Sequence, residues 1–166
     1  MNSEKNEMEL SFDAVSENES FARVAVAAFV THINPTLEEI DDVKTAVSEA
    51  VTNAIIHGYE NYRGYVKGGE GERPVPVHQG KVYVRCRLEG DVLHIEVQDQ
   101  GKGIADIARA MEPMYTSRPE LDRSGMGFSF MEAFMDDLEV ESRPAAGTIV
   151  RMTKKLGSTS WIACGE

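Results

Sequence analysis

The chain has 166 residues and a hydrophobic share of 42%, enough for one domain with a core of its own. Acidic residues outnumber basic ones by 28 to 17, which gives a formal net charge of −11. This charge argues against a nucleic-acid-binding protein, because contacts to a phosphate backbone need a basic face. It does not exclude the binding of one nucleotide, which needs only a local set of hydrogen-bond donors.

The remaining bulk features concern the cellular compartment. Cys86 and Cys164 form neither a CxxC pair nor a zinc spacing, which predicts two reduced thiols. The polar, charged segment up to Glu9 does not resemble a signal peptide. No apolar run reaches the ~18 residues that would indicate a membrane span. We therefore expect a soluble, cytoplasmic protein with no membrane partner.

The first third of the chain predicts a strand followed by two helices. Apolar residues alternate over 8–12, which indicates the strand. Ser16 with Glu19 is a capping-box pattern and predicts a helix over 16–32, which Asn34-Pro35 ends.

A second capping box, Thr36 with Glu39, begins the next predicted helix, and Gly58 stands where a helix-ending glycine belongs. The apolar residues at helical spacing are Leu37, Ile40, Val43, Val47, Val51, Ala54 and Ile55.

The middle of the chain predicts a loop and a hairpin. Residues 61–80 are rich in Gly, Pro and charge and predict a long flexible loop. Alternation over 82–88 and 93–97, around the turn Gly90-Asp91, predicts two paired strands. No regular period persists from Gly101 to Gly127.

The last elements are a helix over 127–136 and strands over 138–142 and 148–153, joined by a turn at Pro144 to Gly147. The element order β-α-α-β-β-(loop)-α-β-β predicts the α+β class. We expect a two-layer sandwich, with helices packed on one face of a mixed, mostly antiparallel sheet. The expected domain is 1–155, followed by a tail, 156–166.

Glu49 and Asn53 lie four residues apart on the second predicted helix and therefore share a face. We place them at the edge of its buried side, facing a cleft. A carboxylate beside an amide carbonyl suits Mg²⁺, which prefers oxygen ligands, and the carboxylate can also act as a general base. An isolated E-x-x-x-N is more often a pair of solvated helix residues.

Asp99 ends a predicted strand, and Gly101 and Gly103 follow it in D-Q-G-K-G. Glycines at such a position let the backbone approach a ligand closely. A buried carboxylate there accepts a hydrogen bond from the amino group of adenine and rejects the carbonyl of guanine. A plain turn after a strand is the alternative.

Gly125 and Gly127 precede a predicted helix in S-G-M-G-F, where free backbone N–H groups suit phosphates. The G-x-x-x-x-G-K-[ST] string of a P-loop is absent, and no βαβ unit supports a dinucleotide fingerprint. Thr148 follows Gly147 at the start of the last strand, where its hydroxyl can reach a base or a bridging water. Each pattern alone also fits an ordinary helix start or strand.

Together the patterns stand in one order: E-A-V-T-N-A-I-I-H-G on a helix, D-x-G-x-G, G-x-G before a helix and a final G-T. This order resembles the GHKL ATPase and kinase superfamily, which includes DNA gyrase, MutL and histidine kinases. S-E-N-E-S-F-A-R, V-S-E-A-V-T-N-A-I-I-H-G-Y, E-L-D-R-S-G-M-G-F and M-E-A-F-M-D-D are further similar to the anti-sigma-F factors of spore-forming bacteria. The likeness spans about Asn6 to Lys155 and departs at 61–80, where this loop is longer.

The resemblance implies a Bergerat ATP-binding fold that takes ATP or ADP with Mg²⁺. It implies that Glu49 is the general base or orients the attacking hydroxyl, that Asn53 holds Mg²⁺, and that Asp99 reads the adenine amino group. The residues it implies for the base pocket are Gly101, Gly103 and Thr148, and those for the phosphates are Ser124, Gly125, Met126, Gly127 and Phe128.

The segment 104–124 resembles the family's ATP lid, with Thr116, Ser117 and Arg123 on the phosphate side. Arg23 matches an arginine that docks partners. The implied function is a homodimeric protein-serine kinase. It would phosphorylate an anti-anti-sigma factor and inhibit a sporulation sigma factor of the sigma-F type.

Two other functions stay open at this point. A detached catalytic domain of the histidine-kinase type needs a phospho-accepting histidine on a dimerising helix pair, and none of the four histidines stands in such a setting. A non-enzymatic module would keep ATP as a structural ligand only. The four histidines are His32, His57, His78 and His94.

Overall fold

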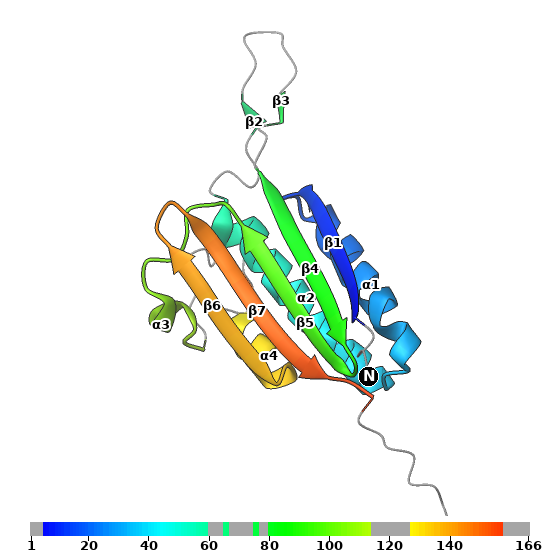
Figure 1. Cartoon of the computed structure of the whole chain (residues 1–166). Coiled ribbons are helices and arrows are strands. Elements are labelled where there is room, and N and C mark those ends of the chain that lie inside the picture. Colours follow the sequence, from blue (N-terminus) through cyan, green and yellow to red (C-terminus); the bar gives the residue numbers. More distant parts are fainter. Residues whose placement is uncertain (1–4, 60–64, 67–74, 77–79, 114–126, 158–166) are drawn as a thin grey trace, which may run out of the picture.

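A computed structural model describes residues 5–59, 65–66, 75–76, 80–113 and 127–157 (Figure 1). Its main sheet has five strands in the order β1-β4-β5-β7-β6, and every ladder between them is antiparallel. The strands are β1 (Lys5–Asp13), β4 (Lys81–Glu89), β5 (Val92–Asp99), β6 (Asp137–Arg143) and β7 (Gly147–Lys155). A separate two-stranded pair, β2 (Tyr65–Val66) with β3 (Val75–Pro76), lies in the segment expected to be loop.

The helices cover one face of this sheet, behind it in Figure 1. They are α1 (Glu17–Val30), α2 (Leu37–Asn53) and α4 (Gly127–Phe134), with a 3-10 turn at Thr31–Ile33 and a π-helix at Ala54–Gly58. A one-turn helix, α3 (Ile107–Ala110), stands where no regular element is expected from the sequence. The prediction of an α+β sandwich with helices on one face is confirmed.

The core lies between the sheet and the helices. Alternate residues of β4 and β5 point inward and are buried, and they meet the inner face of α2. Burial of each large apolar side chain contributes about 1.5–3 kcal/mol to folding. The inward residues include Cys86, and burial raises the pKa of its thiol to about 12, so this thiol is inert.

The two expected capping boxes have different outcomes. At the start of α2, Thr36 N–H donates to Glu39 at 2.8 Å and Glu39 N–H donates to the Thr36 hydroxyl at 3.1 Å, so this box is confirmed. The Ser16 box is wrong, because Ser16 makes no side-chain cap. The Glu19 carboxylate instead accepts from the Ser48 hydroxyl on α2. Leu37, expected on the apolar face of α2, is 82% exposed because it occupies the first turn.

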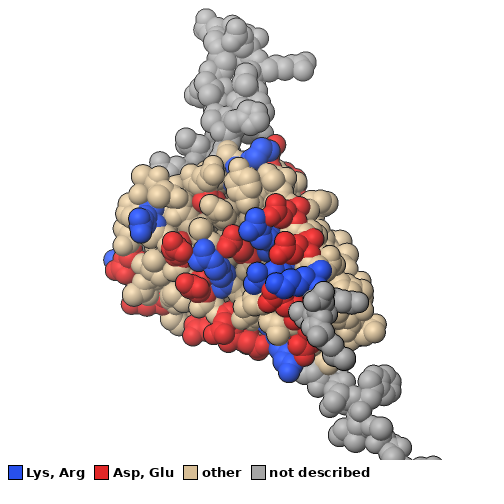
Figure 2. Space-filling view, viewed as in Figure 1, with Lys and Arg blue, Asp and Glu red and all other residues tan. Residues whose placement is uncertain are grey.

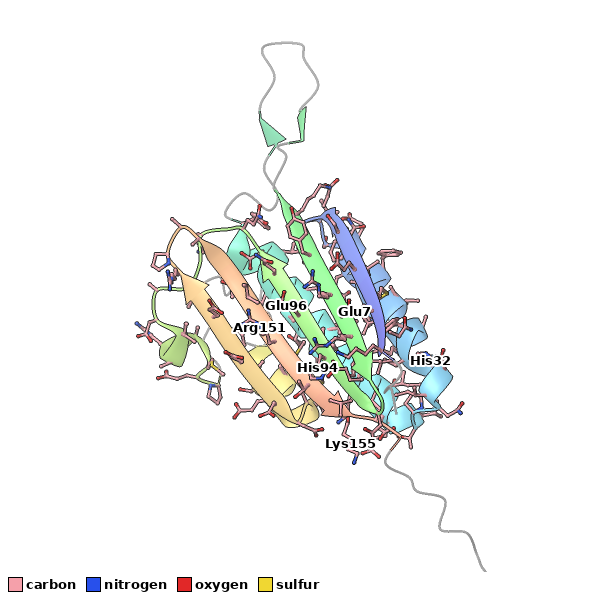
Figure 3. All side chains as sticks on the ribbon, viewed as in Figure 1. Glu7, His32, His94, Glu96, Arg151 and Lys155 are labelled. Carbon is pink, nitrogen blue, oxygen red and sulfur yellow. The ribbon has the colours of Figure 1, made fainter. Side chains whose placement is uncertain are left out.

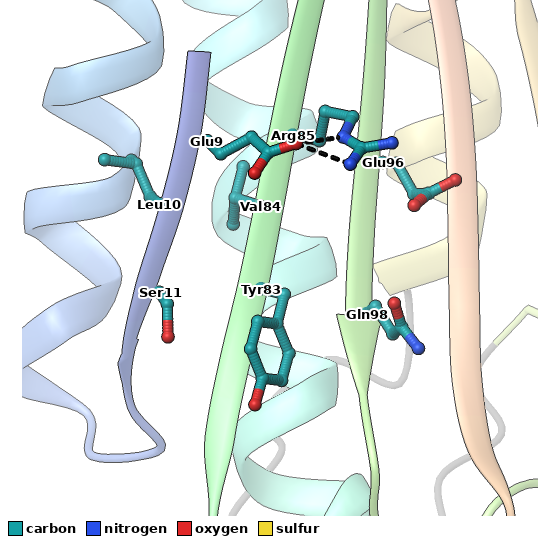
Figure 4. Close-up of a pocket in the computed structure, with 8 residues that line it drawn as sticks. All are labelled: Glu9, Leu10, Ser11, Tyr83, Val84, Arg85, Glu96 and Gln98. Carbon is teal, nitrogen blue, oxygen red and sulfur yellow. Dashed lines mark hydrogen bonds and ion pairs between the residues drawn. The ribbon is translucent and has the colours of Figure 1, made fainter.

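The other face of the sheet carries charges of both signs in rows across the strands (Figure 2). Arg85 on β4 donates to Glu9 on β1 at 2.7 Å, and Arg151 on β7 bridges Glu96 and Glu141 at 3.0 and 2.9 Å. Figure 3 shows Glu96 beside Arg151, and Figure 4 shows the Arg85–Glu9 pair at a shallow depression over β1, β4 and β5. Paired charges leave this face hydrated, as one solvated side of an antiparallel sheet should be.

The end of β7 ties several elements together. Lys154, whose side chain is only 12% exposed, donates to the Phe134 carbonyl at 2.7 Å and pairs with Asp42 at 3.2 Å. Leu156, one residue beyond the expected domain end, is fully buried, and Gly157 N–H donates to Glu39. The packed unit therefore includes these two residues.

Candidate nucleotide-binding site

Glu49 and Asn53, on the last turns of α2, both lie against the first residue of α4. A Cβ added at Gly127 would stand 3.1 Å from Asn53 Nδ2, 3.2 Å from Asn53 Oδ1 and 3.2 Å from Glu49 Oε2. Both side chains are half-buried. The structure therefore brings these three predicted residues together, and a side chain at 127 would require both polar side chains to shift by a few tenths of an ångström.

This arrangement combines three chemical resources. The first N–H groups of α4 have no partner within the helix and carry the positive end of its dipole. The Asn53 carbonyl oxygen suits a hard cation such as Mg²⁺, and the Glu49 carboxylate can accept a proton or orient a hydroxyl. Anionic phosphate, a cation and a nucleophile can therefore meet at one point between α2 and α4.

Asp99, the last residue of β5, provides a second polar centre. Its exposed fraction is 4%, and its carboxylate accepts from Gly101 N–H at 2.9 Å and from the Thr148 backbone N–H. Burial raises the pKa of this carboxyl to about 6, although the two N–H donors act in the opposite direction. A buried carboxylate held in this way is a strong acceptor for a ligand's N–H group.

The π-helix Ala54–Gly58 joins the two centres. Gly58 touches the Asp99 side chain, and its carbonyl accepts from Lys102 N–H at 2.7 Å. A Cβ at Gly101 would lie 1.7 Å from that same carbonyl oxygen. Gly58 thus ends the helix as expected from the sequence, but a glycine is required there because there is no space for a side chain beside Asp99. π-Helical turns are frequent at functional sites. This one begins directly after Asn53 and ends at Gly58, which lies against the Asp99 side chain.

Tyr59 fixes the other side of the Asp99 loop and was not identified from the sequence. Its hydroxyl donates to the Lys81 carbonyl at 2.6 Å and accepts from Gln100 N–H at 2.9 Å. It thereby clamps the β4 and β5 ends together. The H-G-Y string gives no sequence signal for such a clamp, because its partners are backbone groups 22 and 41 residues away.

Thr148 lies beside Asp99, because the two are register partners on neighbouring strands and both are buried. Its hydroxyl oxygen is 2.8 Å from that of Ser142 on β6, a second residue that sequence reasoning missed. Gly103, with φ 71°, packs so closely that a Cβ would lie 2.0 Å from the Arg143 carbonyl oxygen. The residues expected around a base therefore converge at this edge of the sheet.

The side chains of Phe128 and Arg23, also predicted as site residues, do not point at these two polar centres. Phe128 directs its side chain into the core, so only its backbone stands at the start of α4. Arg23 lies on α1, where it contacts Ser48 at 3.4 Å and Glu19 at 3.6 Å. Those outside the described residues are Thr116, Ser117, Arg123, Ser124, Gly125 and Met126.

The sequence and the fold both match known proteins. The model of the histidine kinase-like ATPase domain matches residues 12–154. Anti-sigma F factors of Clostridium acetobutylicum, Oceanobacillus iheyensis and Bacillus subtilis are 58%, 52% and 48% identical to the chain. These matches cover 91%, 95% and 93% of this chain and 94%, 98% and 96% of the relatives. The chain belongs to the anti-sigma F factor family of histidine kinase-like ATPases.

A solved structure agrees with the fold of this anti-sigma F factor family member. The crystal structure of the RsbU and RsbW domains of a Mycobacterium tuberculosis protein matches it with a TM-score of 0.60 at 21% identity. The match covers 91% of this chain and 32% of that longer one, and at this identity it supports the fold alone. Membership of the ATPase family implies that the chain binds ATP or ADP.

The described ranges of this family member lack two further features. None of the helices described is both long and apolar enough to cross a membrane. Within the same ranges no three His, Cys, Asp or Glu side chains are grouped to hold a metal ion.

Proposed function

We propose that this chain is a protein-serine kinase that uses ATP and Mg²⁺ to phosphorylate an anti-anti-sigma factor, and that it also binds and inhibits a sigma factor of the sigma-F type. The single observation that best supports the kinase activity is the contact of Glu49 and Asn53 with Gly127. It puts a candidate base, a candidate Mg²⁺ ligand and a phosphate-binding helix start within one small volume.

In this proposal each side chain has one task. The Asp99 carboxylate accepts the adenine amino group, and the first-turn N–H groups of α4 hold the phosphates. Asn53 would hold Mg²⁺, which neutralises charge that develops on the phosphates. Glu49 orients the serine hydroxyl and takes its proton as the serine oxygen bonds to the γ-phosphorus. The bond from that phosphorus to the bridging oxygen breaks, and ADP leaves.

The sigma-factor part of the proposal rests on the relatives' name and on α1. Arg23 is held by Glu19 and Ser48, so its guanidinium is pre-oriented at the surface. Phe21 and Val24 on the same helix are 55% and 60% exposed. A half-exposed arginine between exposed apolar side chains is typical of a protein-docking surface.

The test uses purified full chain, labelled ATP with Mg²⁺, and an anti-anti-sigma factor with or without its acceptor serine. We expect acid-stable label on the first substrate and none on the second. Acid-labile label would favour a histidine kinase, and no label at equimolar protein would favour a non-enzymatic module. Capture of a sigma-F-type factor in ATP, compared with ADP, tests inhibition, and capture in neither nucleotide would contradict it.

The histidine-kinase alternative is disfavoured by the position of the two long helices. Both α1 and α2 pack on the sheet and contribute buried residues to its core. In the ranges that the structure describes, no helix pair stands outside the sandwich to carry a phospho-accepting histidine.

A further inference from the structure

Ser142 occupies the end of β6 and joins three segments through one hydroxyl. Its oxygen accepts from Ile104 N–H at 2.8 Å, at the start of the segment expected to be the lid. It donates to the Gly147 carbonyl at 2.9 Å and lies 2.8 Å from the Thr148 hydroxyl oxygen. Ser142 is half-buried and is the register partner of Thr148, so all three contacts form on the helix-covered side of the sheet.

These contacts determine where the hydroxyl protons lie. A serine hydroxyl has one proton to donate and two lone pairs to accept with. An N–H group can only donate and a carbonyl can only accept, so Ile104 uses one lone pair and Gly147 takes the only proton. The three bonds can then form together only if Thr148 donates to Ser142. The Thr148 hydroxyl can then accept a hydrogen bond from a ligand but cannot donate one, because its proton is used in the bond to Ser142.

We propose that Ser142 is a specificity-determining residue, which orients the Thr148 hydroxyl as an acceptor beside Asp99 and so selects nucleotides whose base donates at this edge. Because both oxygens then accept, the exocyclic amino group of adenine satisfies them, whereas a carbonyl at the same position of the base finds no donor there. A 6-oxo purine presents a carbonyl there and is rejected.

This inference rests on the proposed nucleotide site and is tested by comparing ATP with inosine triphosphate, which has a carbonyl in place of the 6-amino group and a proton on N1. In Ser142→Ala the Thr148 hydroxyl is free to turn and donate toward that carbonyl. Titration calorimetry gives the dissociation constant of inosine triphosphate divided by that of ATP. We expect this ratio to fall about three- to tenfold in Ser142→Ala, which is the effect of one neutral hydrogen bond. Ser142→Thr keeps the hydroxyl and should retain the wild-type ratio.

A double-mutant cycle separates this role from a merely structural one. In a Thr148→Val background Ser142→Ala should leave the ratio unchanged, because the hydroxyl through which it acts is gone. If Ser142→Ala does not fold, Ser142→Cys, whose thiol is a weaker acceptor, should give an intermediate ratio. An unchanged ratio in a folded Ser142→Ala or Ser142→Cys single variant that binds ATP would overturn this inference alone. A wild-type chain that binds neither nucleotide would overturn the proposed function as well.

Discussion

Gly58 lies so close to Asp99 that a Cβ added to it would stand 2.7 Å from the carboxylate carbon and 2.8 Å from Oδ1. The contact connects the π-helix at the end of α2 to the last residue of β5. It fixes the position of the one carboxylate expected to read the base.

Gly58→Ala should therefore displace Asp99 and weaken ATP binding at least tenfold. It should also destabilise the fold by about 1–3 kcal/mol, as overpacking typically does. Titration calorimetry and denaturant unfolding measure the two effects. The control is Gly90→Asn in the β4–β5 turn, where an added Cβ would meet nothing within 4 Å and asparagine tolerates the left-handed φ of 63°. Equal ATP affinity in the two variants would contradict the role of this contact.

Glu49→Gln should keep ATP binding and lose most phosphoryl transfer, because the amide preserves shape but cannot take the serine proton. General-base catalysis contributes about 10²–10⁴-fold in rate. Single-turnover transfer from labelled ATP to the anti-anti-sigma factor gives the rate, and calorimetry gives the affinity. Glu139→Gln, on an exposed position of β6, is the control with unchanged rate. Full turnover by the Glu49 variant would remove this residue from the mechanism.

ATP affinity should depend on pH through Asp99, because the charged carboxylate is the better acceptor and its pKa is raised to about 6. The dissociation constant should be flat above about pH 7 and rise tenfold per pH unit well below 6. In Asp99→Asn binding should be weak and flat over this range. A wild-type profile without the low-pH rise would contradict the role of this carboxylate in binding.

The same pKa has an opposite effect on the unliganded fold. Because the pKa of Asp99 is higher in the folded than in the unfolded state, folding favours the protonated form. Its contribution to the free energy of unfolding is greatest below pH 4 and is lost as the pH rises to about 6. Wild type minus Asp99→Asn, measured by urea unfolding across this window, should show that loss.

Lys154→Met should destabilise the fold by about 1–3 kcal/mol, because it leaves Asp42 and the Phe134 carbonyl without a largely buried cation. Lys155→Met is the matched control, since its side chain is 61% exposed and its pair with Asp91 is worth at most about 1 kcal/mol. Urea midpoints compare the two. ATP affinity should stay constant in both variants.

Arg23→Ala should abolish capture of the sigma factor and leave ATP binding intact. Ser48→Ala should weaken capture less, because it removes only one of the two groups that orient the guanidinium. Arg85→Ala, on the open face of the sheet, serves as the charge-matched control. Co-purification in ATP measures capture, and retention by the Arg23 variant would move the docking surface elsewhere.

Much of this fold was predictable from local pattern. The alternation in β4 and β5 and the Thr36–Glu39 box each act within a few residues, so the sequence displays them directly. The Ser16–Glu19 box fails for a long-range reason, because Ser48 on another helix takes the Glu19 carboxylate. α3 was missed because it has a single turn, stabilised by the Asp106 cap.

The site was predictable where chemistry and spacing coincide, as with Glu49 and Asn53 on one helix face. Ser142 and Tyr59 were not, because their roles consist of bonds to distant backbone groups. A serine or a tyrosine gives no sign in sequence of which carbonyl or N–H group it will meet. Only the pairing of β6 with β7 and the approach of the π-helix to β5 create those contacts.

Ser48, which anchors Arg23, and Glu49, the proposed base, are consecutive residues of α2. Because both residues belong to one helix, a shift of α2 that moves Ser48 also moves Glu49. The proposed partner contact and the proposed catalytic base therefore depend on the position of the same helix. In the proposed function a nucleotide bound at Asn53, one turn further along, would contact the same helix that carries both residues. The proposed kinase activity and the proposed sigma-factor binding would then both depend on the position of α2, so a displacement of this helix should change both.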